Sequence, residues 1–139
     1  MQAPMFRAIG TALIASASIG CATMAGMRTE PLDAGVAKEY TTDLRTAVSA
    51  TRNALLGSAL EIDDVEEMDE STWMFLAKRK AGKWTIGELV RVLVVQTGEN
   101  VVPIRILSKR RAAMNVSARS DWSDAVFGQI ALDLEERKR

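Results

Sequence analysis

Two apolar segments, "WTIGELVRVLVVQ" (84–96) and "VVPIRILSK" (101–109), determine the architecture that the sequence predicts. Both are rich in β-branched residues, and the connection "TGEN" between them is short and carries glycine, as a hairpin requires. Alternate residues of a strand point to the same face, so each segment places three apolar side chains on one face. These six residues are the predicted centre of the core: Val90, Val92, Val94, Val102, Ile104 and Ile106.

The opposite face of the same two strands is also largely apolar. It carries Leu89, Leu93 and Val95 beside Arg91, and Val101, Pro103 and Leu107 beside Arg105. One interpretation is cover by another part of the chain or by long side-chain stems. The other is a docking surface for a partner or an apolar ligand. Five residues make up this possible partner surface: Leu89, Arg91, Leu93, Arg105 and Leu107.

Further strands are predicted on the N-terminal side of this hairpin. The segment "TWMFLAKRK" (72–80) is joined to it by "AGK", and Leu60, Ile62 and Val65 indicate a short, irregular strand before that. Pro103 has no N–H to donate, which places its own strand at the sheet edge, at least locally.

Seven acidic residues lie between Glu61 and Glu70 and raise the question of calcium binding. An EF-hand loop needs ligands at alternate positions and a glycine at its sharp turn, and neither is present. The acidic segment is therefore interpreted as a solvated charge run, and no metal site is predicted.

Two helices are predicted around the strands. From Ala34 onward, apolar residues recur at spacings of three and four, with Asp33 as the N-cap and Gly57 just past the end. This first helical face is Tyr40, Leu44, Ala47, Val48, Thr51, Ala54 and Leu55. After a loop at 110–120, Ser120 or Asp121 would cap a last helix, whose buried face is Trp122, Ala125, Val126, Ile130 and Leu134.

The order of these elements predicts an α+β fold. An antiparallel sheet of three to four strands would carry the N- and C-terminal helices on one face. Val92, Ile104, Val126 and Ile130 are expected to share its core.

Composition narrows the classes of function. The chain has 139 residues, which suits one domain plus a targeting segment. Its 18 basic and 18 acidic residues balance, so there is no electrostatic signature of nucleic-acid binding. The absence of histidine removes the commonest general base and zinc ligand, and there is no phosphate-binding loop. We therefore expect neither an enzyme nor a cofactor.

The N-terminus has the three regions of a secretory signal. "MQAPMFR" carries one positive charge, "AIGTALIASASIG" is apolar with small residues at its end, and Cys21 follows. The apolar run is shorter than the roughly 20 residues that span a bilayer. The predicted organisation is a lipoprotein signal peptide at 1–20, a lipidated cysteine and tether at 21–33, and one α+β domain at 34–139.

Two cleavage sites compete. Ala15-Ser16-Ala17 fits ordinary signal peptidase, which would release a soluble secreted domain. Ser18, Ile19 and Gly20, followed by Cys21, resemble the lipobox of bacterial lipoproteins, although leucine is usual where Ser18 stands. That resemblance implies that Cys21, the only cysteine of the chain, carries diacylglycerol and becomes the mature N-terminus.

Nearly the whole mature chain resembles a family of small, uncharacterised bacterial lipoproteins with a helix, a four-strand meander and a closing helix. The matching pieces are Cys21, "AVSATRNAL" (47–55), "VVPIRI" (101–106) and "WSDAVFGQIALDL" (122–134). The family has no assigned activity, so the resemblance implies a function only through Cys21.

The resulting functional prediction is a membrane-anchored, non-catalytic module that binds another component of the cell envelope. The alternative is a periplasmic carrier of a small apolar ligand. Ala22 follows Cys21 where aspartate would signal retention in the inner membrane, so an outer-membrane anchor facing the periplasm is expected in a host with two membranes.

Overall fold

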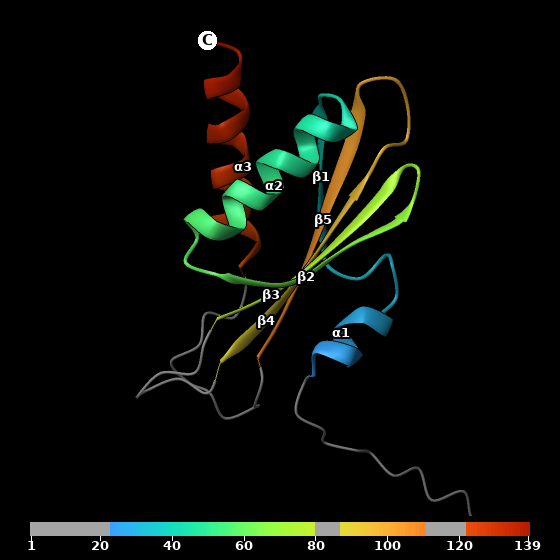
Figure 1. Cartoon of the computed structure of the whole chain (residues 1–139), viewed down its shortest axis with the longest axis vertical. Helices are drawn as coiled ribbons and strands as arrows, with labels where there is room; N and C mark the ends of the chain where they lie inside the picture. The colour runs from blue at the N-terminus through green and yellow to red at the C-terminus, as the bar shows by residue number, and fades with distance from the viewer. Residues whose placement is uncertain (1–22, 80–86, 111–121) are drawn as a thin grey trace, which may run out of the picture.

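The structure is a computed structural model that describes residues 23–79, 87–110 and 122–139. Within these residues, five strands form one antiparallel sheet in the order β1-β5-β4-β3-β2, and three helices accompany it (Figure 1). The elements are α1 (Met24–Thr29), β1 (Val36–Thr41), α2 (Leu44–Gly57), β2 (Glu61–Asp69), β3 (Thr72–Arg79), β4 (Glu88–Val95), β5 (Val101–Arg110) and α3 (Ser123–Arg137). Several predictions fall outside the described residues, namely the signal peptide, the lipobox of Ser18, Ile19 and Gly20, the anchor Cys21, the caps Ser120 and Asp121, and the loop at 111–120.

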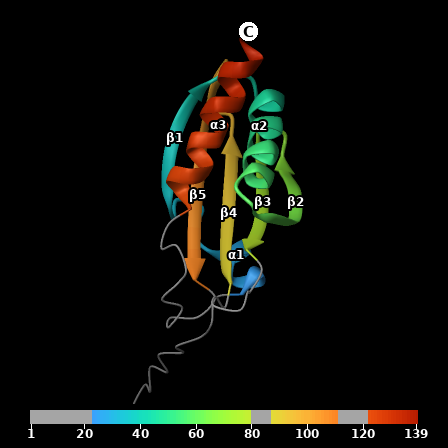
Figure 2. The ribbon, with the colours of Figure 1, turned by 90° about the vertical axis from the view of Figure 1, so that its left-hand side faces the viewer.

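The helices lie on both faces of the sheet. α2 and α3 run side by side over one face, which is here called the inner face (Figure 2). The short helix α1 packs on the opposite, outer face against β3 and β4 (Figure 1). The α+β prediction is confirmed, with one strand more than expected and with the first and last long helices on one face.

The core between the sheet and the two long helices is the predicted one. All six strand residues proposed for it are fully buried, as are Val126 and Ile130 of α3. Small residues on the buried face of α2, Ala47, Ala50 and Ala54, let this helix lie close to its neighbours. The inner layer is therefore filled by side chains, as protein interiors usually are.

The predicted start of the first long helix is wrong. The helix begins at Leu44, because Asp43 caps it: its carboxylate accepts hydrogen bonds from Thr46 N at 2.9 Å and Thr46 Oγ1 at 2.8 Å. Residues 36–41 instead form β1 and pair with β5. Tyr40 matched the helical spacing, yet it belongs to this strand, where β-branched and aromatic residues are favoured.

The prediction that Pro103 lies at the sheet edge holds only locally, because β5 is an inner strand of the sheet. β1 pairs with β5 on the side away from β4, and Glu39 of β1 lies opposite Pro103. On the other side of β5, the register with β4 ends at Ile104, opposite Val94, so Pro103 lies just beyond that ladder. A proline is tolerated there because the missing N–H interrupts no β4–β5 pair.

β2 is the second edge strand, and it is longer than predicted. It has register shifts between Ile62 and Asp64 and between Glu67 and Asp69, so the expected irregularity is present. Most of its side chains are exposed, in agreement with a solvated charge run. Charged residues and bulges of this kind protect an exposed edge from pairing with other chains.

Candidate functional site

The residues of the possible partner surface lie together on the outer face of the sheet. Arg91 is opposite Leu107, and Leu93 is opposite Arg105, across the β4–β5 pair. They are not, however, an open surface. Leu89, Arg91 and Leu93 are at most 2% exposed, while Arg105 and Leu107 are half-buried. The chain itself covers them through residues 23–35, which agrees with the interpretation of cover by another part of the chain and corrects the alternative of a docking surface.

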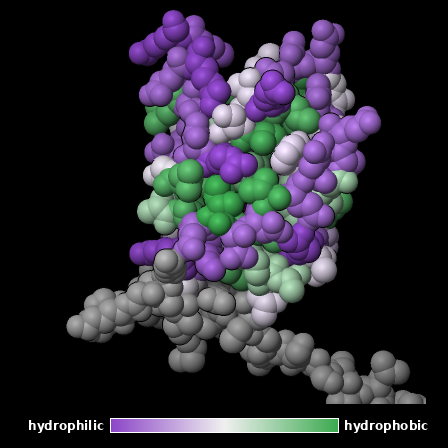
Figure 3. Space-filling model, viewed as in Figure 1, coloured by the Kyte–Doolittle hydropathy of each residue, from purple (hydrophilic) through white to green (hydrophobic). Residues whose placement is uncertain are grey.

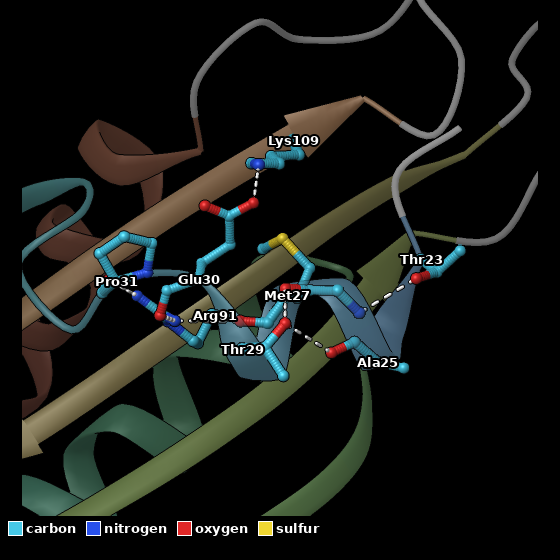
Figure 4. Close-up of polar contacts among 9 residues, drawn as sticks. Thr23, Ala25, Met27, Thr29, Glu30, Pro31, Arg91 and Lys109 are labelled. Atoms are coloured by element: carbon cyan, nitrogen blue, oxygen red, sulfur yellow. Dashed lines mark hydrogen bonds and ion pairs between the residues drawn. The ribbon is translucent and has the colours of Figure 1, made fainter. Parts of the chain in front are cut away.

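Arg91 anchors the covering segment. Its Nη1 donates hydrogen bonds to the carbonyl oxygens of Met27 at 3.0 Å and Glu30 at 2.7 Å, and its Nη2 donates to that of Pro31 at 2.7 Å (Figure 4). The last carbonyls of a helix lack partners within it and carry partial negative charge. One buried guanidinium therefore provides hydrogen-bond donors for carbonyl oxygens at the C-terminal end of α1 and in the turn beyond it.

The charged guanidinium of Arg91 lies in a buried environment, where charged groups are uncommon. Burial lowers the pKa of its guanidinium, the charge of Glu30 opposes this, and Arg105 lowers the pKa further. Arginine remains protonated in proteins even so. Among the described residues its Nε has no hydrogen-bond partner, so the three carbonyl contacts carry the compensation for burial.

Arg105 extends this anchoring beyond α1. Its Nη1 donates to the carbonyl oxygens of Asp33 at 2.7 Å and Gly35 at 3.2 Å. Gly35 has φ of +99°, and a Cβ there would lie 2.2 Å from the carbonyl oxygen of Ile106. Only glycine fits this close approach, because L-residues avoid this conformation and β5 leaves no room. The backbone of residues 33–35 is thus fixed against β5 before β1 begins.

Under α1 lies a second, smaller apolar cluster, separate from the core on the inner face. Its fully buried members are Met27, Met74, Leu76, Leu89 and Leu93, with Met24, Val95 and Leu107 at its margin. The unbranched, flexible side chains of Met24, Met27 and Met74 suit a contact between a six-residue helix and a twisted sheet.

Ion pairs at the rim hold the same segment. Arg28 pairs with Asp64 and Glu66 on β2, and Lys109 on β5 pairs with Glu30 (Figure 4 shows the second pair). The hydrogen bond to Asp64 is the main reason that the pKa of Arg28 is raised. These exposed pairs contribute little to stability but fix where the segment lies.

A buried carboxylate marks the end of the sheet next to α1. Glu88, the first residue of β4, is 1% exposed and accepts a hydrogen bond from Trp122 Nε1. Arg79 Nη1 lies 3.4 Å from Glu88 Oε1, and its guanidinium lies 5.9 Å from the Trp122 ring centre. This cluster ties the start of α3 to the ends of β3 and β4.

Two open clefts lie away from the outer face. One of about 730 Å³ lies between β1 and the ends of α2 and α3, with Tyr40, Thr42, Thr46, Leu134 and Arg137 in its wall. Burial raises the pKa of the Tyr40 phenol there.

The second cleft, of about 450 Å³, lies between α2 and the β2–β3 hairpin. Leu44, Val48 and Trp73 line it beside Arg52 and Glu67. Figure 3 shows apolar residues gathered in the middle of the face seen in Figure 1, with hydrophilic residues on either side. The chain contains no histidine that could serve as a general base in either cleft.

Within residues 23–79, 87–110 and 122–139, no three His, Cys, Asp or Glu side chains are arranged to hold a metal ion. The same ranges contain no helix of the length and apolarity that a membrane crossing needs.

Sequence reasoning missed the residues that cover the outer face. The sequence predicts a tether at 21–33, but Thr23 caps α1 by accepting a hydrogen bond from Gly26 N at 3.0 Å. Two signals were available: Met24 and Met27 have helical spacing, and Thr23 is a preferred N-cap residue. A six-residue helix is too short for its periodicity to be decisive.

Comparison with known proteins adds no relative: no model of a protein family matches the sequence, and no curated protein matches it. The resemblance to small bacterial lipoproteins therefore stays a prediction.

Proposed function

We propose that this protein is a bacterial lipoprotein, anchored through Cys21, whose folded domain is a non-catalytic module that binds another component of the cell envelope. In a host with two membranes, the proposed location is the outer membrane, facing the periplasm. The observation that carries the proposal is the position of Thr23. Thr23, which caps α1 by accepting a hydrogen bond from Gly26 N, comes only two residues after the cysteine that the lipobox marks.

This position is compatible with removal of residues 1–20. Cleavage before Cys21 would keep Met24 and Met27 in the chain for their contacts on the outer face, and it would place the lipid next to the N-cap of α1. Several acyl chains on one residue would hold the domain firmly, because each buried CH₂ contributes about 0.8 kcal/mol.

Packing favours a binding module over the alternative of a small-ligand carrier. A carrier that holds its ligand between helices and sheet needs space there, whereas 18 buried residues fill this layer. The two clefts described are open and lie at the margins of the layer, where they suit contact with a macromolecule better than enclosure of an apolar ligand.

A comparison of the wild type with Cys21→Ser tests the anchor. Both are expressed in a bacterial host, fractionated on a density gradient and analysed by intact mass. We expect the wild type in the outer-membrane fraction with the mass of a diacylated Cys21 N-terminus, and Cys21→Ser without lipid. Equal release of both proteins from membranes, or a wild type cleaved after Ala17, would contradict the proposal.

The absence of a carried ligand is tested separately. The wild-type domain, purified from the periplasmic face under mild conditions, is denatured and extracted with organic solvent. A module should release no stoichiometric small molecule, whereas a carrier should release one apolar compound per chain.

A further inference from the structure

We infer that one end of the domain faces the lipid surface and that the cleft beside Tyr40 faces away from it. This basal end is defined by Thr23, Ala59, Arg79, Glu88 and Trp122. The inference rests on the proposed function, because it takes Cys21 as the attachment point. Beyond the proposed function, it names the end of the domain that faces the membrane and the partner of that end, a phospholipid bilayer.

Strand register places these residues at the same end. Arg79 lies opposite Glu88, and Glu88 lies opposite Arg110 on the next strand. Glu61 lies opposite Lys78, so the connection through Ala59 into β2 reaches the same end. Trp122 is hydrogen-bonded to Glu88, which brings the start of α3 there as well.

The start of α1 also lies at this end. Figures 1 and 2 both show α1 at the end of the sheet opposite the C-terminus, and Figure 4 shows Thr23 beside the end of β3. The turn at 97–100, residues 41–43 and the C-terminus lie at the other, distal end. A strand of eight residues such as β4 separates the two ends by roughly 25 Å.

The connection between lipid and domain is too short to let the domain turn freely. Cys21 and Ala22 together span at most about 7 Å when extended. Thr23 does not add to this reach, because it is the N-cap of a helix that Arg91 holds at its other end. A lipid inserted at Cys21 therefore holds the basal end near the headgroups.

The described cations at the basal end are compatible with this orientation but do not cause it. Lys78, Arg79 and Lys109 are about one-third to two-fifths exposed there. Each is paired with a carboxylate, so attraction to anionic lipid is partly neutralised. The short connection sets the orientation, and the described cations do not oppose it.

Depth measurements test the orientation with the intact lipidated protein. Once Cys21 is lipidated, an introduced cysteine is the only free thiol, so a fluorophore can be placed at one site. Ala59→Cys and Asp124→Cys report on the basal end, and Glu99→Cys, in the turn between β4 and β5, is the matched distal control. All three positions are exposed. The proteins are bound to vesicles of phosphatidylethanolamine and phosphatidylglycerol that contain a lipid with a quencher on its headgroup.

We expect strong quenching at Ala59→Cys and Asp124→Cys and none at Glu99→Cys beyond that seen with vesicles lacking the quencher. Because Ala59 lies at the end of α2, on the face opposite α1, its quenching separates this orientation from a domain lying on its α1 face. Insertion of 20 Gly/Ser residues between Ala22 and Thr23 should abolish the difference, since such a linker has a reach of about 25 Å.

Equal quenching at all three sites, or quenching at Asp124→Cys without Ala59→Cys, would overturn the inference for a protein that is membrane-bound. Retention of the full difference with the linker would also overturn it, because the short connection would then not be the cause. A protein that stays in the supernatant with a free Cys21 thiol would instead overturn the proposed function.

Discussion

The guanidinium of Arg91 on β4 donates a 2.7 Å hydrogen bond to the carbonyl oxygen of Pro31, 60 residues earlier in the chain. Together with its bonds to Met27 and Glu30, this contact makes the segment around α1 part of the folded domain. The outer face of the sheet is therefore a second buried layer, although a helix of only six residues covers it. Because few residues stabilise this outer layer, single substitutions can test its contribution to the stability of the domain.

Replacement of Arg91 by methionine should destabilise the domain by about 2–4 kcal/mol, because the buried carbonyl of Met27 and the part-buried carbonyls of Glu30 and Pro31 lose a charged donor. Methionine keeps much of the side-chain length and adds no clash. The control is Arg45→Met on α2, where the side chain is exposed and the change should cost under about 0.5 kcal/mol. Urea unfolding midpoints of the two variants test the contrast. Similar midpoints would show that Arg91 does not anchor α1.

The inner core could be predicted from sequence because its signals are local and repeated. Val90, Val92 and Val94 alternate along β4, and a glycine-bearing connection fixes their pairing with β5. Val126 and Ile130 follow a helical spacing and occupy the core as predicted. The α+β class followed from the order of such segments.

The predictions that failed concern elements whose sequence signals are ambiguous at short range. Tyr40 and Leu44 fit a helical face, yet they belong to a strand and a helix separated by the cap Asp43. The cover of Arg91 could not be predicted from the residues around it, because it comes from carbonyls 60 to 64 positions away. Backbone carbonyls leave no signature in a sequence, so the apolar outer face was open to two interpretations.

Gly35 and Gly128 offer a pair of glycines with opposite expected effects. Gly35→Ala should destabilise by about 1–3 kcal/mol, since alanine is strained at φ of +99° and would approach the Ile106 carbonyl oxygen to 2.2 Å. Gly128 lies within α3 with open space around its Cα, so Gly128→Ala should stabilise by about 0.5–1 kcal/mol. Thermal unfolding of both variants gives the two signs, and a shift in the same direction for both would contradict this assignment.

Asp43 should make the start of α2 sensitive to acid. Hydrogen bonds from the backbone and hydroxyl of Thr46 hold the pKa of the Asp43 carboxyl below its usual 3.8. The charged form thus stabilises the folded state above the unfolded pKa, and this contribution is lost as pH falls through the lower folded pKa. Asp43→Asn keeps a capping oxygen without the charge.

The difference in stability between wild type and Asp43→Asn should therefore be constant near neutral pH and shrink as pH falls from about 5 to about 2. Other acidic groups act equally in both proteins, so the difference isolates Asp43. Urea midpoints across this range provide the measurement, and a difference that grows on acidification would have the wrong sign.

The inner core makes a simple quantitative prediction. Ile104→Ala should destabilise by about 2–5 kcal/mol, because Ile104 is fully buried and its truncation leaves a cavity. Leu56→Ala on α2, where the side chain is 57% exposed, should change the stability by less than about 0.5 kcal/mol. Denaturant midpoints would expose a wrong assignment of faces if the two variants behaved alike.

Leu93 decides whether the outer face is closed in solution. It is 2% exposed beneath α1, in the same cluster as Met27 and Met74, and its neighbour across the pair with β5 is Arg105. Leu93→Glu would bury a carboxylate among methionines, because Arg105 already donates to the carbonyls of Asp33 and Gly35. We expect this variant to unfold, or to fold only with α1 released from the sheet.

The control is Leu132→Glu on α3, where the leucine is 59% exposed, and this variant should fold normally. Circular dichroism detects unfolding, and hydrogen exchange at the amides of residues 26–30 detects release of α1. A Leu93→Glu variant with native stability and a protected α1 would mean that the outer face tolerates charge and is open to water.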